Sequence, residues 1–299
     1  MAARIGDLAH SRRLTADLGA IQKRLREAEA AAGSGKAATR YDQIADRAGE
    51  LLRVEDARAV KATLADQNER LLQRLQLMDG ALGSVVDIAA RTRTALIQRV
   101  DGGLGADVPL DTMIDGMAAE LESALNLRLD GQYLFAGSRS DAAPVAIPSP
   151  PPTTADPALY YAGDSVRLTA RADLGLNLSY GVTADAAPVA GLIAALGQAR
   201  AAHLADDRTG LEAAMAGLEQ ALDGLTGLRA GVGVTAERLE SVAEGQRSAI
   251  LYLDEIVASI EDVDLAEVLT RIAADRTALE AGYSVTGKLA SLSLADYLR

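Results

Sequence analysis

The chain has 299 residues, 49% of them apolar, and a formal net charge of −12 at pH 7. This negative balance argues against a nucleic-acid-binding protein, because neutralising phosphates requires clustered Lys and Arg. The absence of cysteine excludes disulfides, thiolate metal sites and cysteine catalysis, and no stretch approaches the roughly 18 apolar residues of a membrane-spanning helix. The N-terminus has no apolar run of signal-peptide length, so we expect any export to proceed without a cleaved signal of that kind.

A helix with a coiled-coil seam is predicted near the N-terminus. Apolar residues recur there at spacings of 4, 3, 4, 3 and 4, namely Leu14, Leu18, Ile21, Leu25, Ala28 and Ala32. The stretch AGSGK at 32–36 is expected to end this helix. The string GSGKAA is not a phosphate-binding loop, because Ala30 and Ala37 replace the Gly and the Ser or Thr that such a loop requires.

A longer helix is predicted over residues 44–100. Its seam is formed by Val60, Leu64, Leu71, Leu75, Met78, Leu82, Val85 and Ala89. The spacing is again 4, 3, 4, 3 and 4 from Leu71 onward, and the step before it, with Gln67 on the seam, indicates a stutter. At about 1.5 Å per residue such a helix would be roughly 80 Å long, which is typical of a rod.

The middle of the chain is predicted to be irregular, because all eight prolines lie between Pro109 and Pro188. A shorter helix is expected over residues 111–127, and residues 149–157 read as a loop. The segment 160–182 alternates apolar and polar residues around turn residues, which favours short antiparallel strands. We therefore predict a small β insert here.

The chain is predicted to become helical again from Val189, with a second long helix over residues 207–262. Glycines at 224, 227, 231 and 233 weaken it by roughly 1 kcal/mol each relative to Ala, so we expect a kink or break there. A final seam carries Leu265, Val268, Ile272, Leu279 and Tyr283, and the ending LASLSLADYL adds Leu289, Leu292 and Leu298.

Together these elements predict a mainly α protein. Both chain ends would form a long antiparallel helical rod or coiled-coil bundle, with a small β-rich insert in the middle. We expect three parts: an N-terminal helical part at 1–139, the β insert at 140–184 and a C-terminal helical part at 185–299 that packs on the first. Residues 1–40 carry a net charge of +4 and residues 254–299 a net charge of −5, so the two ends are expected to pair, within or between subunits.

No residue pattern indicates catalysis or a cofactor. The only histidines, His10 and His203, lie in separate helical ends, and neither HExxH nor GxSxG occurs. Glu261, Asp262 and Asp264 lack the spacing of a calcium loop, so we interpret them as a charged helix terminus. We expect no enzyme, no metal and no cofactor.

The stretch LDGQYLFAGS at 129–138 holds Phe135, the only phenylalanine of the chain. Gly131 and Gly137 permit a tight chain reversal, and Tyr133 and Phe135 alternate onto one side of a short extended segment. We interpret this stretch as local core. Its expected role is to fix the β insert to the end of the helical rod.

Several of these motifs together resemble the flagellin family, and within it the hook-associated proteins of the hook–filament junction. The resemblance rests on the first seam with Ser34-Gly35-Lys36, on LRAGVGVTAERLE at 228–240, on ASIEDVDLAEVLTRI at 258–272 and on the ending. The junction type is indicated by Asn126, Asp130-Gly131, Tyr133, Phe135, Gly137 and Pro144. The chain departs from the family at residues 39–43, where an acidic pair is usual.

The resemblance implies a structural subunit of the bacterial flagellum that joins hook and filament. It would be exported by the flagellar type III route without signal cleavage and would self-associate into a tube through its terminal helices. Its expected partners are a hook-side junction protein, flagellin and an export chaperone, with no nucleic acid and no membrane insertion. The terminal seams would then find partners only in the assembly. Two alternatives stay open: a flagellin-like filament subunit and a cytoplasmic coiled-coil adaptor.

Overall fold

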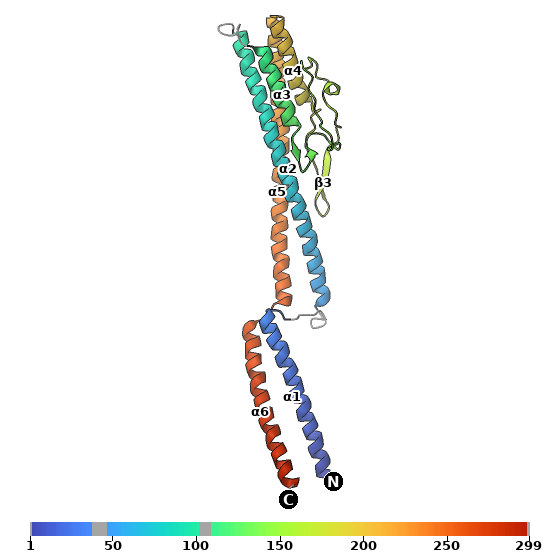
Figure 1. The fold of residues 1–299 in the computed structure, drawn as a ribbon, viewed down its shortest axis with the longest axis vertical. Coiled ribbons are helices and arrows are strands. Elements are labelled where there is room, and N and C mark those ends of the chain that lie inside the picture. Colours follow the sequence, from blue (N-terminus) through green and yellow to red (C-terminus); the bar gives the residue numbers. More distant parts are fainter. Residues whose placement is uncertain (1, 38–46, 102–108, 298–299) are drawn as a thin grey trace. The chain divides into compact units, whose positions relative to one another are not determined.

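The computed structural model describes residues 2–37, 47–101 and 109–297, with side chains from 12 to 288 within those ranges. These ranges contain six α-helices, one short 3₁₀ helix and two two-stranded antiparallel sheets. In chain order they are α1 (Ala2–Ser34), α2 (Ala48–Val100), α3 (Leu110–Leu125), β1 (Arg128–Leu129), β2 (Gln132–Tyr133), η3 (Pro157–Leu159), β3 (Leu168–Asp173), β4 (Leu176–Tyr180), α4 (Ala187–Leu204), α5 (Arg208–Glu261) and α6 (Leu265–Tyr297) (Figure 1). The predicted mainly α fold with a small β insert is confirmed.

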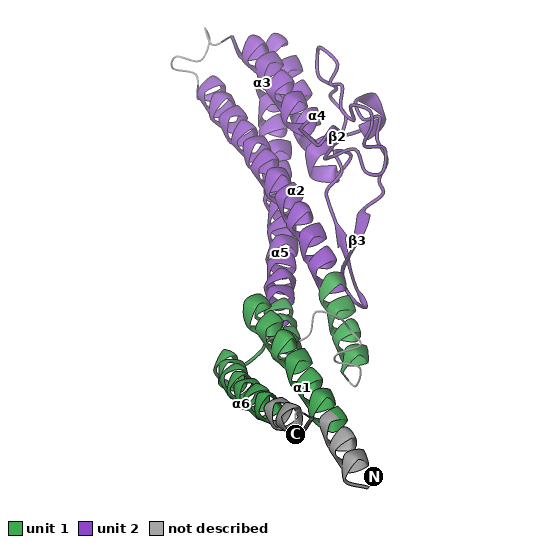
Figure 2. Ribbon diagram, turned by 60° about the horizontal axis from the view of Figure 1, so that its bottom comes forward, with its two compact units in different colours: residues 1–59, 250–299 green, residues 60–249 purple. Residues whose placement is uncertain are grey.

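The chain divides into two compact units (Figure 2). Unit 1 comprises residues 1–59 and 250–299, so it joins both ends of the chain, and unit 2 comprises residues 60–249. The boundaries expected from the sequence, near 140 and 185, both lie inside unit 2. The helices α2 and α5 contribute to both units, because each crosses a unit boundary.

Within unit 2, α2 and α5 run antiparallel. Two ion pairs that join them show the direction, because the residue number falls on α5 as it rises on α2: Glu69 with Arg247 at 2.6 Å and Asp79 with Arg229 at 2.9 Å. Such exposed pairs contribute little stability. The stability comes from the seam between the helices, where the leucines of both bury in one continuous core.

The stutter predicted in α2 is wrong. Gln67 is exposed, whereas Asn68 is buried with 1% of its surface exposed. With Asn68 included, the buried positions follow the spacing 4, 3, 4, 3, 4, 3 and 4 without interruption: Leu64, Asn68, Leu71, Leu75, Met78, Leu82, Val85 and Ala89. Counting only apolar residues hid this position, because a polar side chain occupies a place on the seam.

The break predicted in α5 is also wrong. The helix continues from Arg208 to Glu261 through all four glycines. Leu225, Val232 and Leu239 are buried on the same seam across this stretch. Burial of side chains of this size contributes about 1.5–3 kcal/mol each, which outweighs the roughly 1 kcal/mol that each glycine costs the helix.

The β insert of unit 2 lies beside the helices α3 and α4. The strands β3 and β4 form the antiparallel hairpin expected in 160–182, with Leu168 opposite Tyr180. A second hairpin, β1–β2, directly follows α3. Ala172 and Leu178 of the insert are buried in the same core as α2 and α5, so the insert forms part of the core of unit 2.

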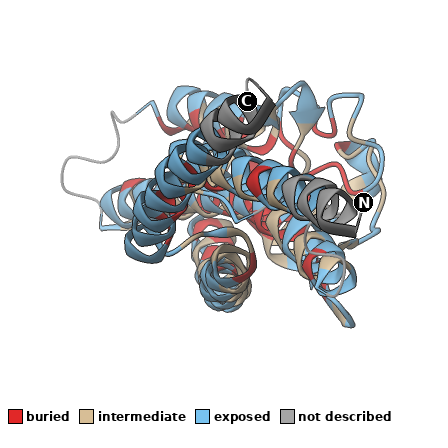
Figure 3. Cartoon of the chain, turned by 90° about the horizontal axis from the view of Figure 1, so that it is seen from below, coloured by how far each residue is buried: buried red, intermediate tan, exposed pale blue. Residues whose placement is uncertain are grey.

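Within unit 1, α1 packs against α6 (Figure 1). Their contact buries Ala28 against Val268 and Ile272. The backbones approach closely where Leu18 covers Gly282: a Cβ at Gly282 would lie 2.4 Å from Cδ2 of Leu18. In Figure 3 few residues of these helices are buried, and most are exposed or half-buried.

This pairing corrects one expectation. The terminal seams were expected to find partners only in an assembly. The described parts of these seams, Leu14–Ala32 on α1 and Leu279 on α6, instead lie on the contact between α1 and α6 within one chain. The basic and acidic ends meet within one chain, and Arg24 of α1 bonds Asp275 of α6 at 2.9 Å. A second ion pair has the acidic residue on α1 and the basic residue on α6: Glu29 bonds Arg276 at 2.7 Å.

The turn after α1 ends the helix where the sequence predicts. The helix ends at Ser34, and Gly35 has a φ of +71°, which favours glycine. The next residues pair with the segment between α5 and α6: Lys36 forms a β-bridge with Asp262, and Val263 N donates to Gly35 O at 3.1 Å. The turn after α1 and the segment between α5 and α6 are therefore hydrogen-bonded to each other.

Candidate assembly site and the segment around Phe135

The residues predicted as an assembly seam lie on the contact between α1 and α6. Leu18 and Leu279 are buried, and Leu14, Ile21 and Leu25 are half-buried. Tyr283 is 51% exposed, and its hydroxyl accepts a hydrogen bond from Gln22. Leu289, Leu292 and Leu298 were also predicted for this seam, but their side chains lie outside the described residues. The seam's role in assembly stays a prediction.

Three large apolar side chains of α6 are at least half exposed, although one of them, Tyr283, also bonds Gln22 of α1 through its hydroxyl. Leu265, Leu269 and Tyr283 are between 50% and 58% exposed. At 3.6 residues per turn these three side chains follow one side of α6, next to the buried stripe of Val268, Ile272 and Leu279. We call Leu265, Leu269 and Tyr283 the open face of α6.

Asp275 is a charged residue at a buried position of the α1–α6 contact. It is 6% exposed and continues the spacing between Ile272 and Leu279. One carboxylate oxygen bonds Arg24, while the other is buried with no hydrogen-bond partner. A half-paired buried carboxylate weakens the contact that contains it, so the α1–α6 pair is held less firmly than an all-apolar seam of the same length.

The segment around Phe135 begins with the β1–β2 hairpin. Its two turn residues, Asp130 and Gly131, have φ values of 51° and 81°, as a two-residue type I′ turn requires. Tyr133 is half-buried, and the guanidinium of Arg128 lies 4.8 Å from the centre of its ring. The tight reversal predicted at Gly131 is confirmed.

Phe135 is completely buried in the core of unit 2. Its carbonyl accepts from Ala184 N at 3.0 Å and from the Tyr161 hydroxyl at 3.2 Å. The ring and its backbone thus connect the end of β2 to the chain that leads into α4. The interpretation of Phe135 as local core is confirmed.

Gly137 permits a close approach to Asp164. Its φ is +69°, and a Cβ there would lie 2.2 Å from Oδ1 and 2.3 Å from the carbonyl oxygen of Asp164. Ser138 donates to the Asp164 carboxylate through its hydroxyl and, at 2.9 Å, through its backbone N–H. These hydrogen bonds lower the pKa of Asp164, which keeps it ionised and bound to the turn.

Asn126 fixes the start of the insert to the end of α3. Its side-chain amide donates to Val145 O at 2.8 Å and accepts from Val145 N at 3.1 Å. One turn earlier, the Glu122 carboxylate accepts from Ile147 N at 2.8 Å. Glu122 of α3 and the next residue after the helix, Asn126, therefore satisfy three backbone groups of Val145 and Ile147.

Tyr160 and Tyr161 donate hydrogen bonds to backbone carbonyls near the segment around Phe135. The Tyr160 hydroxyl donates to Ala184 O at 3.0 Å. The Tyr161 hydroxyl has one proton, which Asp164 O at 2.8 Å shares with Phe135 O at 3.2 Å. Burial raises the pKa of both phenols above their ordinary range. Both stay protonated donors, which suits a structural role.

The other polar residues considered from the sequence have structural partners. His203 accepts from Arg99 at 3.1 Å, and the side chain of His10 lies outside the described residues. Glu261 pairs with Lys36 at 2.7 Å. Asp264 accepts from the N–H groups of Ala266 and Glu267 at the start of α6, which is the capping geometry of a helix N-terminus.

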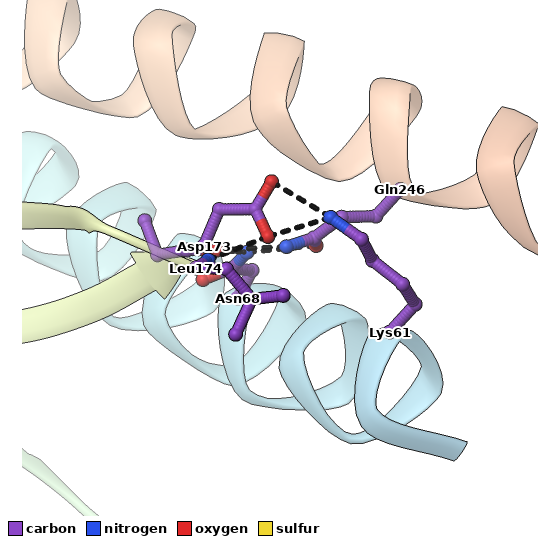
Figure 4. Close-up of polar contacts among 6 residues, drawn as sticks. Lys61, Asn68, Asp173, Leu174 and Gln246 are labelled. Carbon is purple, nitrogen blue, oxygen red and sulfur yellow. Dashed lines mark hydrogen bonds and ion pairs between the residues drawn. The ribbon is translucent and has the colours of Figure 1, made fainter. Parts of the chain in front are cut away.

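Sequence reasoning missed one polar cluster in unit 2 (Figure 4). Asn68 of α2 and Gln246 of α5 are both 1% exposed, and Asn68 Nδ2 donates to Gln246 Oε1 at 2.9 Å. Lys61 of α2 pairs with Asp173 at the end of β3 at 2.7 Å. The signal in the sequence is that Asn68 continues the 4, 3 spacing of the apolar seam.

No group of side chains with the composition of a metal site occurs in the described parts of the chain. Among the described helices, none has the length and apolar character needed to cross a membrane. The features described above are the packing seams between helices, the open face of α6 and the hydrogen bonds that connect the insert to the helices.

The comparisons with known proteins agree with this arrangement. A family model described as the bacterial flagellin C-terminal helical region matches residues 215–298. This part of the chain is similar to the C-terminal helical region of flagellin. The matched region comprises most of α5 and all of α6, which includes the open face. No curated protein matches the chain.

Two solved structures share the fold of this chain. The crystal structure of FlgL from Bacillus cereus has a TM-score of 0.56 at 16% identity, covering 70% of this chain and 99% of that one. A putative flagellar hook-associated protein from Vibrio parahaemolyticus has a TM-score of 0.53 at 18% identity, covering 71% and 96%. At such identities the likeness is one of fold. Together with the family match, it confirms the predicted resemblance to hook-associated proteins of the flagellin family.

Proposed function

We propose that this protein is a structural subunit of the bacterial flagellum that joins the hook to the filament. The observation that carries the proposal is the open face of α6, within the region that matches the flagellin family. A helix that buries one apolar stripe on α1 and exposes another has surface left for a neighbouring subunit.

The charges of unit 1 support self-association. Arg12, Arg13 and Arg26 of α1 are exposed, as are Glu267 and Glu280 of α6. Opposite charges beside an apolar face favour one partner orientation over others. Copies of the subunit would pack their terminal helices side by side into a tube, with the insert of unit 2 facing outward.

The proposal names partners from the family resemblance. A hook-side junction protein and flagellin would contact the assembled subunit, and an export chaperone would bind it beforehand. The subunit would reach the outside of the cell by the flagellar type III route without a cleaved signal. We infer a structural role and no catalysis.

A second candidate is a flagellin-like filament subunit. The family match favours it, because the matching model describes the C-terminal helical region of flagellin itself. The likeness of fold to FlgL and to a hook-associated protein favours the junction. The two candidates differ in where the protein lies along the flagellum.

Immunogold electron microscopy separates the candidates. An epitope inserted after Thr154, in an exposed loop of unit 2, would mark the protein on detached flagella. A junction subunit gives label confined to the hook-proximal end, and cells lacking the gene carry hooks without filaments. Label along the whole filament would instead support the filament subunit. Label in the cell body only would support an adaptor.

The open face is tested separately with Leu269→Asp. The substitution places a charge on the open face, and the matched control Ala274→Asp places the same charge on the opposite side of α6. We expect Leu269→Asp to abolish incorporation into flagella while the purified protein keeps its helical circular dichroism. Incorporation of Leu269→Asp at the level of the control would remove the open face from the assembly contact.

A further inference from the structure

The seam between α2 and α5 contains one polar layer. Asn68 and Gln246 occupy seam positions that are otherwise apolar in the described parts of both helices within unit 2, except for Thr92, whose hydroxyl donates to Ile88 O of its own helix at 2.8 Å. Buried amides are stable only where each finds a partner, and leaving one without a partner costs about 1–3 kcal/mol. The layer is therefore the place where a wrong alignment of the two helices would be most unfavourable.

The partner of both amides is a single backbone carbonyl of the insert. Asn68 Nδ2 donates to Ala172 O at 2.8 Å, and Gln246 Nε2 donates to the same oxygen at 2.7 Å. With the bond between the two side chains, these contacts form a closed set of three (Figure 4). The insert thus completes the layer, and neither helix could satisfy it alone.

A β-bulge makes this carbonyl available. Arg171 pairs with Asn177 and Asp173 pairs with Leu176, so Ala172 has no partner of its own across the hairpin. A bulge leaves the extra residue unpaired and redirects its backbone. Ala172 is completely buried, and its carbonyl is directed at the polar layer instead of at β4.

A second contact holds the hairpin in this position. Lys61 Nζ lies 2.7 Å and 3.0 Å from the two carboxylate oxygens of Asp173, one residue beyond the bulge. The Asp173 carboxylate also accepts from Leu174 N at 2.7 Å, which closes the turn. Asn68 and Lys61 lie two turns apart on the same helix, so the hairpin is fixed to α2 at two points.

We propose that the β3–β4 hairpin fixes the axial alignment of α2 with α5 in unit 2. The carbonyl of Ala172 accepts from Asn68 and Gln246 together, so the two helices can satisfy the polar layer in only one alignment. The apolar residues of the seam repeat with the same spacing, and by themselves they would accept a shift of one heptad. The inference concerns the single chain and is independent of the proposed function.

The test replaces the layer with apolar residues. In Asn68→Leu/Gln246→Leu the seam loses both amides and keeps only apolar residues and Thr92, so the helices keep their far-ultraviolet circular dichroism. The control is Gln67→Leu, which makes the same change at the neighbouring exposed position. A second variant, deletion of Ala172, removes the bulge and leaves both amides in place.

The stagger is measured with spin labels. The chain has no cysteine, so Leu77→Cys and Val234→Cys, both at exposed positions on α2 and α5, provide unique labelling sites. The parent and the Gln67→Leu control should give one narrow distance distribution. The double variant and the deletion should give a broadened or second distribution, since a one-heptad slip moves one helix by about 10 Å along the other.

Hydrogen exchange at residues 172–176 provides the second measurement. We expect exchange there at least about tenfold faster in the double variant than in the control, because the hairpin loses its attachment. Unchanged exchange together with an unchanged distance would overturn the proposal. Faster exchange with a single narrow distance would overturn it as well, since the apolar seam would then set the stagger without the hairpin.

Discussion

Phe135 is the only phenylalanine of the chain and lies in the core where the insert meets the helices. Its ring is completely buried, so Phe135→Ala should lower the free energy of unfolding of unit 2 by about 3–5 kcal/mol. Denaturant titration with mapping of protease cuts would show the loss, with early cuts in the insert. Leu174→Ala is the control, because Leu174 is exposed in the β3–β4 turn. Equal stability of the two variants would contradict the assignment.

Gly137 and Gly131 allow two effects to be compared: the strain of a positive φ, and the steric clash of an added Cβ with a neighbouring residue. Both have positive φ, but only at Gly137 would a Cβ collide with another residue, 2.2 Å from Asp164 Oδ1. Gly131→Ala should therefore show the backbone strain alone, of order 1–2 kcal/mol. Gly137→Ala should be more destabilising, because the Asp164 turn must also move. Thermal melts of the two variants measure the difference, and a smaller loss for Gly137→Ala would refute the argument.

At the residue scale, turn conformation and side-chain burial can be predicted from nearby sequence, whereas contacts with residues far along the chain cannot. The turn at Asp130-Gly131 and the burial of Phe135 follow from residue type and spacing. The partners do not: Asp164 lies far along the chain from Gly137, and nothing in its surroundings in sequence marks it. Asp275 was likewise missed as a buried group, because a charged residue on a helix usually faces water.

At the scale of elements, the glycines of α5 offer a direct test of packing against helix propensity. Around Gly231 there is no atom within 4 Å of an added Cβ, whereas at Gly224 the Cβ would lie 2.6 Å from Pro188 Cγ. Gly231→Ala should raise the free energy of unfolding by about 0.5–1 kcal/mol. Gly224→Ala should lower it, because α4 would be displaced. Denaturant titrations of both variants measure these changes. A loss of stability in Gly231→Ala would contradict the conclusion that a side chain at position 231 meets no other atoms.

The seams of the long helices were predictable because a 4, 3 spacing is visible in one segment at a time. The partner of each seam was not, since periodicity says that a face is buried and nothing about what covers it. For this reason the sequence left the terminal seams without an intramolecular partner, although α1 packs on α6. The Asn68 position shows the same limit: its amide fits the seam only because Ala172 and Gln246 meet it there.

At the scale of the whole molecule, the two units differ in how much core they have. The buried cluster between α1 and α6 consists of Ala28, Val268 and Ile272, whereas unit 2 has a large core that includes Phe135. We expect the amides of α1 and α6 to exchange much faster than those of α2 and α5 within unit 2. Hydrogen exchange of the purified monomer measures this. Equal protection of all four helices would show that unit 1 is as stable as unit 2.

The pairing of α1 with α6 joins two helices that lie more than 200 residues apart in the sequence. Contacts between such distant segments form late, because the intervening chain must first be ordered. A polypeptide whose synthesis stops before Leu265 lacks α6 altogether. It leaves Leu18 and Ala28 uncovered, and it cannot present Leu265, Leu269 and Tyr283 beside the basic residues of α1. Under the proposed function, a chain that lacks α6 also lacks the surface that a neighbouring subunit would contact.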